Sequence, residues 1–218
     1  MFNYYLWIIS LFSYILLYLK KNKFSLDNQI KYNDFADKRK LNFMCCNMCC
    51  KINNFNDVIS NIVYTFGGLF QIFYRDNFYL GISSILVSIG SAYYHLNPNM
   101  RTLFYDRFPM QIAFTYLIFD NVPLESYEKI LMLFYSFGSV IYWNYTYDLI
   151  LYASFQLSMI LYLIIFNTNM FIPVLFYIIA KICEDKDKQI YDKLNNNFCV
   201  FSGHTLKHII SGLALFFI

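Results

Sequence analysis

Long apolar blocks separated by short polar links set the pattern of this chain. Within the blocks, apolar and polar residues do not alternate with the period of two that a strand requires, so the blocks predict helices. One block covers residues 1–19, and a polar segment, 20–56, follows it. Seven further blocks lie at 57–74, 78–96, 107–123, 129–143, 147–166, 169–182 and 202–218.

The lengths of these blocks predict an all-α, polytopic membrane protein, because about 20 apolar residues of helix cross a hydrocarbon core of about 30 Å. We expect an N-terminal signal or anchor helix at 1–19, a polar surface segment at 20–56 and a core of seven transmembrane helices at 57–218. Lys20, Lys21 and Lys23 follow the first block rather than precede it. A signal peptide carries its positive charge first, so a retained anchor is favoured over a cleaved signal.

Composition agrees with a membrane protein and excludes several other classes. Hydrophobic residues make up 58% of the 218 residues and charged residues only 14%, whereas a soluble domain carries about 25% charge. The net charge is +3 and no basic patch is interleaved with stacking aromatics, so nucleic-acid binding is not expected. The absence of glycine-rich phosphate loops and of G-x-S-x-G argues against nucleotide cofactors and serine-elbow chemistry. The sequence implies no protein partner.

Lys and Arg are unevenly distributed around the predicted helices. The segments 20–56, 97–107, 144–146 and 183–201, with the flanking Lys181, hold 14 of the 17 Lys and Arg residues. Seven crossings that start from segment 20–56 place all four segments on one side, and the positive-inside rule makes that side cytosolic. In a eukaryotic cell, the endoplasmic reticulum or Golgi membrane is the expected location.

A group of polar residues interrupts the apolar pattern between 90 and 109, in the stretch GSAYYHLNPNMRTLFYDRFP. Ser91 and His95 are four residues apart and share one helix face. Asn97 is expected to end that helix, since the residue before a proline avoids the α region. Asp106 then stands just before the next block, with Pro109 at a first-turn position. The pattern therefore predicts a hydroxyl, an imidazole and a carboxylate at one membrane edge.

The last apolar block begins with a second polar pair. His204 and His208 are four residues apart on one face, and with His95 they are the three histidines of the chain, all at one membrane level. Three imidazoles from two helices form a natural zinc set with a fourth position open. Ionisable groups within a membrane are costly and by default mark a function. The alternative is a structural network of interhelical hydrogen bonds among Ser, His and Asp.

These motifs together resemble the ceramidase family, within the CREST superfamily of seven-helix membrane hydrolases. The resemblance extends from about residue 30 to the end of the sequence, and the bacterial-type branch is the most similar. It rests on S-A-Y-Y-H at 91–95, Y-D-R-F-P-M at 105–110, H-T-L-K-H at 204–208, N-D-V-I-S-N at 56–61, D-F-A-D-K-R at 34–39, and the stretch 180–190.

The resemblance implies a zinc ion held by His95, His204 and His208, which would supply hydroxide at neutral pH. It implies that Asp106 takes and returns a proton and that Ser91 donates a hydrogen bond to the developing oxyanion. The implied reaction cleaves the N-acyl amide of a ceramide-like lipid, taken from the bilayer, into a sphingoid base and a fatty acid. Two alternatives stay open: another CREST-type lipid acyl hydrolase, such as a lipid-anchor remodelling enzyme, and a receptor-like or scaffold protein with a structural zinc.

Other polar residues near these motifs receive supporting or surface roles. Asp57, Ser60 and Asn61 open the first core block, and we expect them to support the metal site through interhelical hydrogen bonds. Glu184 and Asp187 stand beside two lysines and are interpreted as part of a solvated charged surface.

The family resemblance also implies a calcium site in the polar segment. Asp34 and Asp37 could ligate such a hard cation through oxygen. Arg39 cannot ligate a cation, however, and Asn54 is neutral where the family has an acid. The sequence therefore argues against calcium at this position.

The C-C-x-x-C-C cluster in the polar segment allows three interpretations. Reduced cytosolic thiols without a role agree with the predicted topology, membrane-proximal S-acylation is the second, and a further zinc site is the third. The cluster consists of Cys45, Cys46, Cys49 and Cys50.

Overall fold

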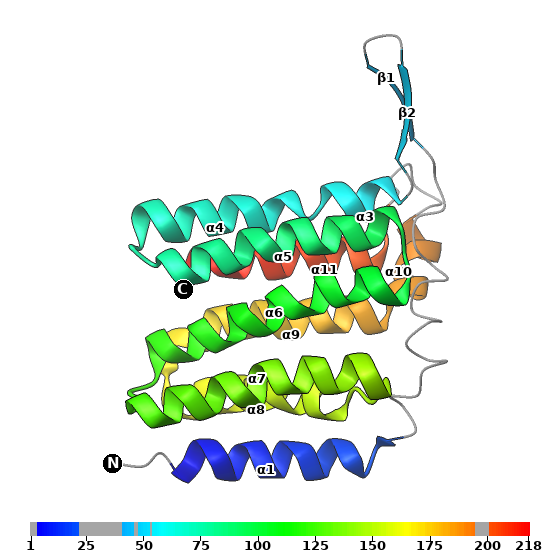
Figure 1. The fold of residues 1–218 in the computed structure, drawn as a ribbon. Helices are drawn as coiled ribbons and strands as arrows, with labels where there is room; N and C mark the ends of the chain where they lie inside the picture. The colour runs from blue at the N-terminus through cyan, green and yellow to red at the C-terminus, as the bar shows by residue number, and fades with distance from the viewer. Residues whose placement is uncertain (1–3, 22–40, 46–47, 53, 195–200) are drawn as a thin grey trace.

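A computed structural model describes residues 4–21, 41–45, 48–52, 54–194 and 201–218 of the protein. Its helices lie side by side in one bundle, and the hairpin of β1 and β2 projects from one end (Figure 1). The first elements are α1 Tyr4–Tyr18, β1 Leu41–Cys45, β2 Met48–Ile52, α3 Phe55–Ile59, α4 Ile62–Tyr74, α5 Phe78–Leu96 and α6 Met100–Asn121. The remaining elements are α7 Ser126–Thr146, α8 Ile150–Phe166, η2 Thr168–Met170, α9 Phe171–Asp185, α10 Asp187–Leu194, α11 Gly203–Ala214 and η4 Leu215–Phe217.

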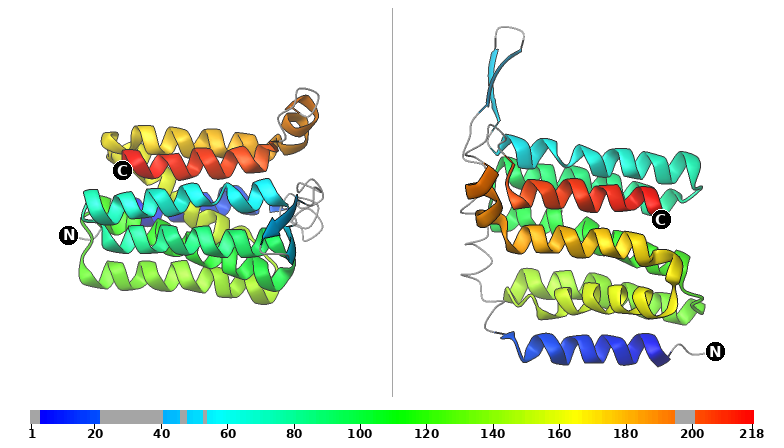
Figure 2. Two further views of the ribbon diagram at one scale, coloured as in Figure 1. Left: turned by 90° about the horizontal axis from the view of Figure 1, so that it is seen from above. Right: turned by 180° about the vertical axis from the view of Figure 1, so that it is seen from behind.

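The predicted all-α architecture is confirmed, because each apolar block forms a helix of the bundle. Helices that follow one another in sequence pack together from α4 to α9, while α11 returns to lie between α4 and α9. The first helix, α1, packs on α8 at the edge of the bundle (Figures 1 and 2). Among the described helices, none combines the length and the apolar character that a membrane crossing requires.

Two boundaries differ from the sequence-based expectations. The block 57–74 divides into α3 and α4 at Ser60 and Asn61. The backbone N–H of Asn61 bonds to the carbonyl of Val58, three residues back instead of four, at 3.4 Å. The helix α6 begins at Met100, so the prediction that Pro109 lies in its first turn is wrong. Asn99 caps α6 by accepting hydrogen bonds from two backbone N–H groups, and Pro109 lies in the interior of the helix.

The core of the bundle combines apolar packing with hydrogen-bonded polar groups. Leu6, Ile118, Met132, Phe155 and Met159 are fully buried and bring α1, α6, α7 and α8 together. Buried polar side chains lie at the same helix contacts and satisfy one another across them, as polar groups in a helical bundle do. The bonded pairs include Gln111 with Ser139, Gln156 with Gln111 and Thr115 with Ser136.

Truncation of Phe155 tests this packing. We expect Phe155→Ala to lower the free energy of unfolding by about 3–5 kcal/mol, because the side chain is fully buried and its removal leaves a cavity. The measurement is thermal unfolding of the purified protein. The matched control is Phe134→Ala, since Phe134 is 73% exposed; equal losses in the two variants would contradict the placement of the core.

Candidate metal centre

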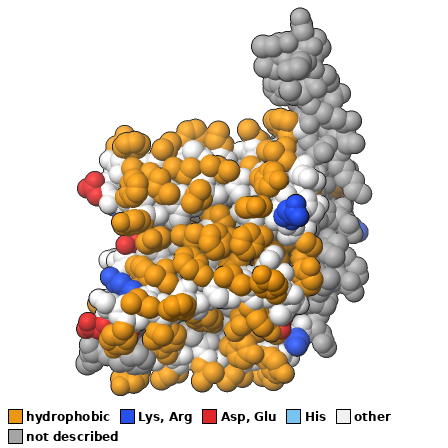
Figure 3. Space-filling view, in the orientation of Figure 1, with side chains coloured by type: hydrophobic (Ala, Val, Ile, Leu, Met, Phe, Trp, Pro, Cys, Tyr) orange, Lys and Arg blue, Asp and Glu red, His pale blue; other side chains and the backbone are white. Residues whose placement is uncertain are grey.

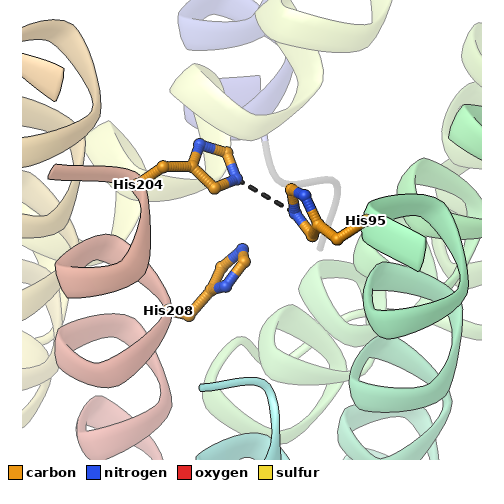
Figure 4. Close-up of side chains that lie close together, drawn as sticks. All are labelled: His95, His204 and His208. Atoms are coloured by element: carbon orange, nitrogen blue, oxygen red, sulfur yellow. Dashed lines mark hydrogen bonds between the residues drawn. The ribbon is translucent and has the colours of Figure 1, made fainter. Parts of the chain in front are cut away.

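The three histidines lie together at one end of the bundle. His95 occupies the last turn of α5, whereas His204 and His208 occupy the first two turns of α11. Ser202 caps α11 by accepting a hydrogen bond from the backbone N–H of Thr205, so the helix starts where the sequence predicted. Figure 4 shows the three imidazoles facing one another across the gap between the two helices.

The imidazole nitrogens are close enough to share one ion. The Nε2 atoms of His95 and His204 are 3.1 Å apart, and one nitrogen of each histidine lies within 4.8 Å of the others. Two nitrogens bound to one tetrahedral zinc at about 2.0–2.1 Å would be separated by roughly 3.3 Å. His95 and His208 are 3% and 1% exposed. The cluster could therefore hold a metal ion with three nitrogen donors.

The hydrogen bonds of His208 indicate which of its nitrogens faces the centre. Its Nδ1 lies 2.9 Å from the hydroxyl of Ser60, on the outer side of the ring. Its Nε2 is buried and makes no hydrogen bond within the described residues. A buried polar atom without a partner requires an explanation, and an ion bound among the three imidazoles would supply that partner.

The predicted supporting residues contact the helices that carry the histidines. Asp57 is 1% exposed, and its Oδ1 accepts hydrogen bonds from the hydroxyls of Thr205, at 2.5 Å, and Ser202, at 3.3 Å. These bonds tie α3 to the first turn of α11. The carbonyl of Asn61 accepts a hydrogen bond from Ser88 at 2.7 Å, which braces α5.

Asn54, the residue before α3, also contacts the site, although the sequence analysis did not predict a supporting role for it. The Nδ2 atom of Asn54 donates to the carbonyl of His95 at 2.7 Å, and Asn54 itself is buried with a φ of 50°. The left-handed region is one that Asn tolerates better than most residues. Asn54 therefore joins the entry of the bundle to the helix end that carries His95.

Ser91 and Asp106 are brought together across the contact of α5 with α6. Their side chains are hydrogen-bonded to each other, and Ser91 is buried. The helices cross closely because Gly90 has no side chain: a Cβ atom there would lie 1.9 Å from the Tyr105 carbonyl oxygen. That carbonyl has no N–H to accept from four residues later, because the residue there is Pro109. Ser91 lies one turn before His95 on α5, so the bonded pair lies toward the end of α5 that carries His95.

Two acidic residues beside His204 were missed by the sequence analysis. Glu184 is only 12% exposed at its side chain and pairs with Lys207 at 2.9 Å and with Lys181. Asp187 is buried and accepts a hydrogen bond from the backbone N–H of His204 at 2.7 Å. The interpretation of both acids as solvated surface is therefore wrong. One sequence feature could have indicated this. Both acids come directly after an apolar block, on the same predicted side of the membrane as the histidines.

The electrostatic surroundings of Asp187 reflect its position at the start of α10. Burial raises the pKa of this carboxyl group, while the hydrogen bond from the backbone N–H of His204 acts in the opposite direction. The bond from the His204 N–H is the contact through which Asp187 holds the start of α11.

Some predicted residues lie outside the described part of the chain. The doubtful calcium ligands Asp34 and Asp37 are among them, as are the side chains at the four cysteine positions of the polar segment.

Comparison with known proteins adds no assignment: no family model matches the chain, and neither curated proteins nor solved structures provide a match.

The contact between Ser60 and His208 leads to a prediction about metal affinity. We expect Ser60→Ala to weaken zinc binding by about 10–100-fold, because the imidazole loses the group that fixes its orientation. The measurement is competition with a chromophoric chelator, and Ser158→Ala is the control, since Ser158 is also a buried serine but lies in α8. Unchanged affinity in Ser60→Ala would contradict this role.

Proposed function

We propose that this chain is a membrane-embedded, zinc-dependent amidohydrolase that cleaves the N-acyl amide of ceramide-like lipids. The observation that carries the proposal is the convergence of three imidazoles, of which those of His95 and His208 are buried, beside a hydrogen-bonded Ser91–Asp106 pair. The resemblance to the ceramidase family supplies the substrate class. A zinc ion bound by His95, His204 and His208 would provide an activated water at neutral pH.

The Ser91–Asp106 pair supplies the proton transfers of the proposed reaction. Asp106 is the base that accepts a proton from the attacking water and later returns it to the leaving amine. As a carboxylate, Asp106 accepts the hydrogen bond of the Ser91 hydroxyl. Once protonated, it becomes a donor to the Ser91 oxygen. The hydroxyl hydrogen of Ser91 is then free to turn toward the oxyanion that develops on the amide carbonyl, where a donor lowers the barrier.

An apolar cavity inside the bundle supports a substrate with an acyl chain. Its volume is about 120 Å³, and its walls include Val87, Met110, Phe114 and Val174. Tyr64 also lines it, and the ring of Tyr64 lies 6.3 Å from that of His208, centre to centre. An acyl chain in this cavity would therefore begin near the metal centre and continue into the bundle.

The surface of the bundle supports a location within a membrane. Large apolar side chains are exposed along the helices, among them Phe66 at 56%, Phe73 at 72% and Ile89 at 60%. In Figure 3, hydrophobic side chains cover most of the visible face, and charged side chains lie near its two ends. Apolar areas of this extent are rare on monomeric soluble proteins. The seven predicted crossings would place the metal centre on the side rich in Lys and Arg.

Metal content and turnover, measured on the same samples, test the proposal. Detergent-purified wild type should contain about one zinc per chain and hydrolyse ceramide, whereas His208→Ala should lose both because one of the three nitrogen donors is missing. Zinc without ceramide turnover would direct the search to other lipid amides and esters, as the lipid-anchor alternative expects. A folded wild type that binds no zinc would refute the metal centre.

The exchange Asp106→Asn separates an enzyme from a protein with a structural zinc. We expect zinc content and fold to be retained and turnover to fall by about 10²–10⁴-fold, because an amide cannot act as a general base. Zinc analysis and a ceramide turnover assay make the comparison. Loss of zinc and fold together would mean that Asp106 is structural and would contradict the proposed mechanism.

A further inference from the structure

We infer that Glu184 is a positioning residue for His204: its carboxylate, held by Lys207 and Lys181, orients the imidazole from outside the metal centre. The inference rests on the metal centre of the proposed function but not on the substrate or the reaction.

The two ring nitrogens of His204 face different surroundings. Nε2 faces Nε2 of His95 at 3.1 Å, which is the inner side of the cluster. Nδ1 faces the other way and lies 4.0 Å from Oε1 of Glu184. Metal-bound histidines almost always donate their second N–H to a carboxylate, a carbonyl or a water, which fixes the ring and raises its basicity. At 4.0 Å, a small rotation of either side chain or one bridging water completes that contact.

Two lysines hold the carboxylate of Glu184 in place. Lys207 donates to Oε1 at 2.9 Å, and Lys181 donates to Oε2 from one turn earlier on α9. The side chains of Glu184 and Lys207 are only 12% and 15% exposed, so water screens this pair weakly. Each carboxylate oxygen thus has a lysine partner, which holds Glu184 in place as an outer partner of His204.

The backbone around Glu184 is attached to His204 as well. Asp187, just after the end of α9, accepts the hydrogen bond from the His204 backbone N–H at 2.7 Å. The chain approaches this closely because Gly203 has no side chain: a Cβ there would lie 2.2 Å from the Cys183 carbonyl oxygen. The turn from α9 to α10 therefore holds both the main chain and the imidazole of His204, and the distance from Glu184 to that ring is set by short, local connections.

The test is the zinc affinity of Glu184→Gln, a variant that keeps the shape of the side chain and loses its charge. We expect affinity, measured by chelator competition, to fall by about 10–100-fold. We also expect the visible absorption bands of the Co²⁺-substituted protein to shift, because the ligand field of His204 changes. The matched control is Asp120→Asn, which removes one acidic charge at the C-terminal end of α6, away from the histidines. It should change neither readout.

A second variant distinguishes positioning from a merely structural ion pair. Glu184→Gln alone leaves Lys207 buried without its partner, so the double variant Glu184→Gln/Lys207→Gln removes both charges. If Glu184 positions His204, zinc affinity stays low in the double variant. Recovery of wild-type affinity there, or wild-type affinity and an unshifted Co²⁺ spectrum in Glu184→Gln, overturns the inference. A wild type that binds no zinc overturns it together with the metal centre, whereas a zinc-loaded wild type without ceramide turnover overturns only the proposed reaction.

Discussion

The hydrogen bonds between Asp57 and the first turn of α11 are the interaction on which the arrangement of the site depends. A buried carboxylate accepts from Ser202 and Thr205, and hydrogen bonds to a charged acceptor are about twice as strong as those between neutral groups. The same turn carries His204, and the next turn carries His208. Any shift of this helix start would move both imidazoles together relative to His95, which belongs to a different helix.

The two histidines of α11 have outer partners of different chemical character. His208 faces the neutral hydroxyl of Ser60, whereas His204 faces the carboxylate of Glu184, which is balanced by two lysines. All of these groups lie at helix ends or on rigid helices, and precise sites in proteins are built on such elements. The candidate metal centre is thus assembled from short contacts made by α3, α9 and α11, with His95 of α5 facing it from the other side.

Sequence patterns predicted the parts of this structure that depend on local spacing. The apolar blocks marked the helices, and the spacing of four residues between His204 and His208 placed them on one face. The start of α6 was misjudged because a capping interaction at Asn99 lengthens the helix into a polar link. The low exposure of Glu184 was missed because a charged residue near lysines has the same local pattern on a surface as in a buried ion pair. Only the tertiary packing of α9 against α11 separates the two cases.

The close crossing of α5 and α6 makes positions 90 and 109 interdependent, although position 90 belongs to α5 and position 109 to α6. If the residue at position 109 had a backbone N–H, the Tyr105 carbonyl could accept a hydrogen bond from it within α6. The carbonyl oxygen would then move away from Gly90 and leave space beside it. A side chain at position 90 would need that space. Exchanges at the two positions should therefore be non-additive, each compensating part of the damage done by the other. A paired exchange should therefore disturb this contact less than either single exchange, and the separation of Ser91 from Asp106 should change with it.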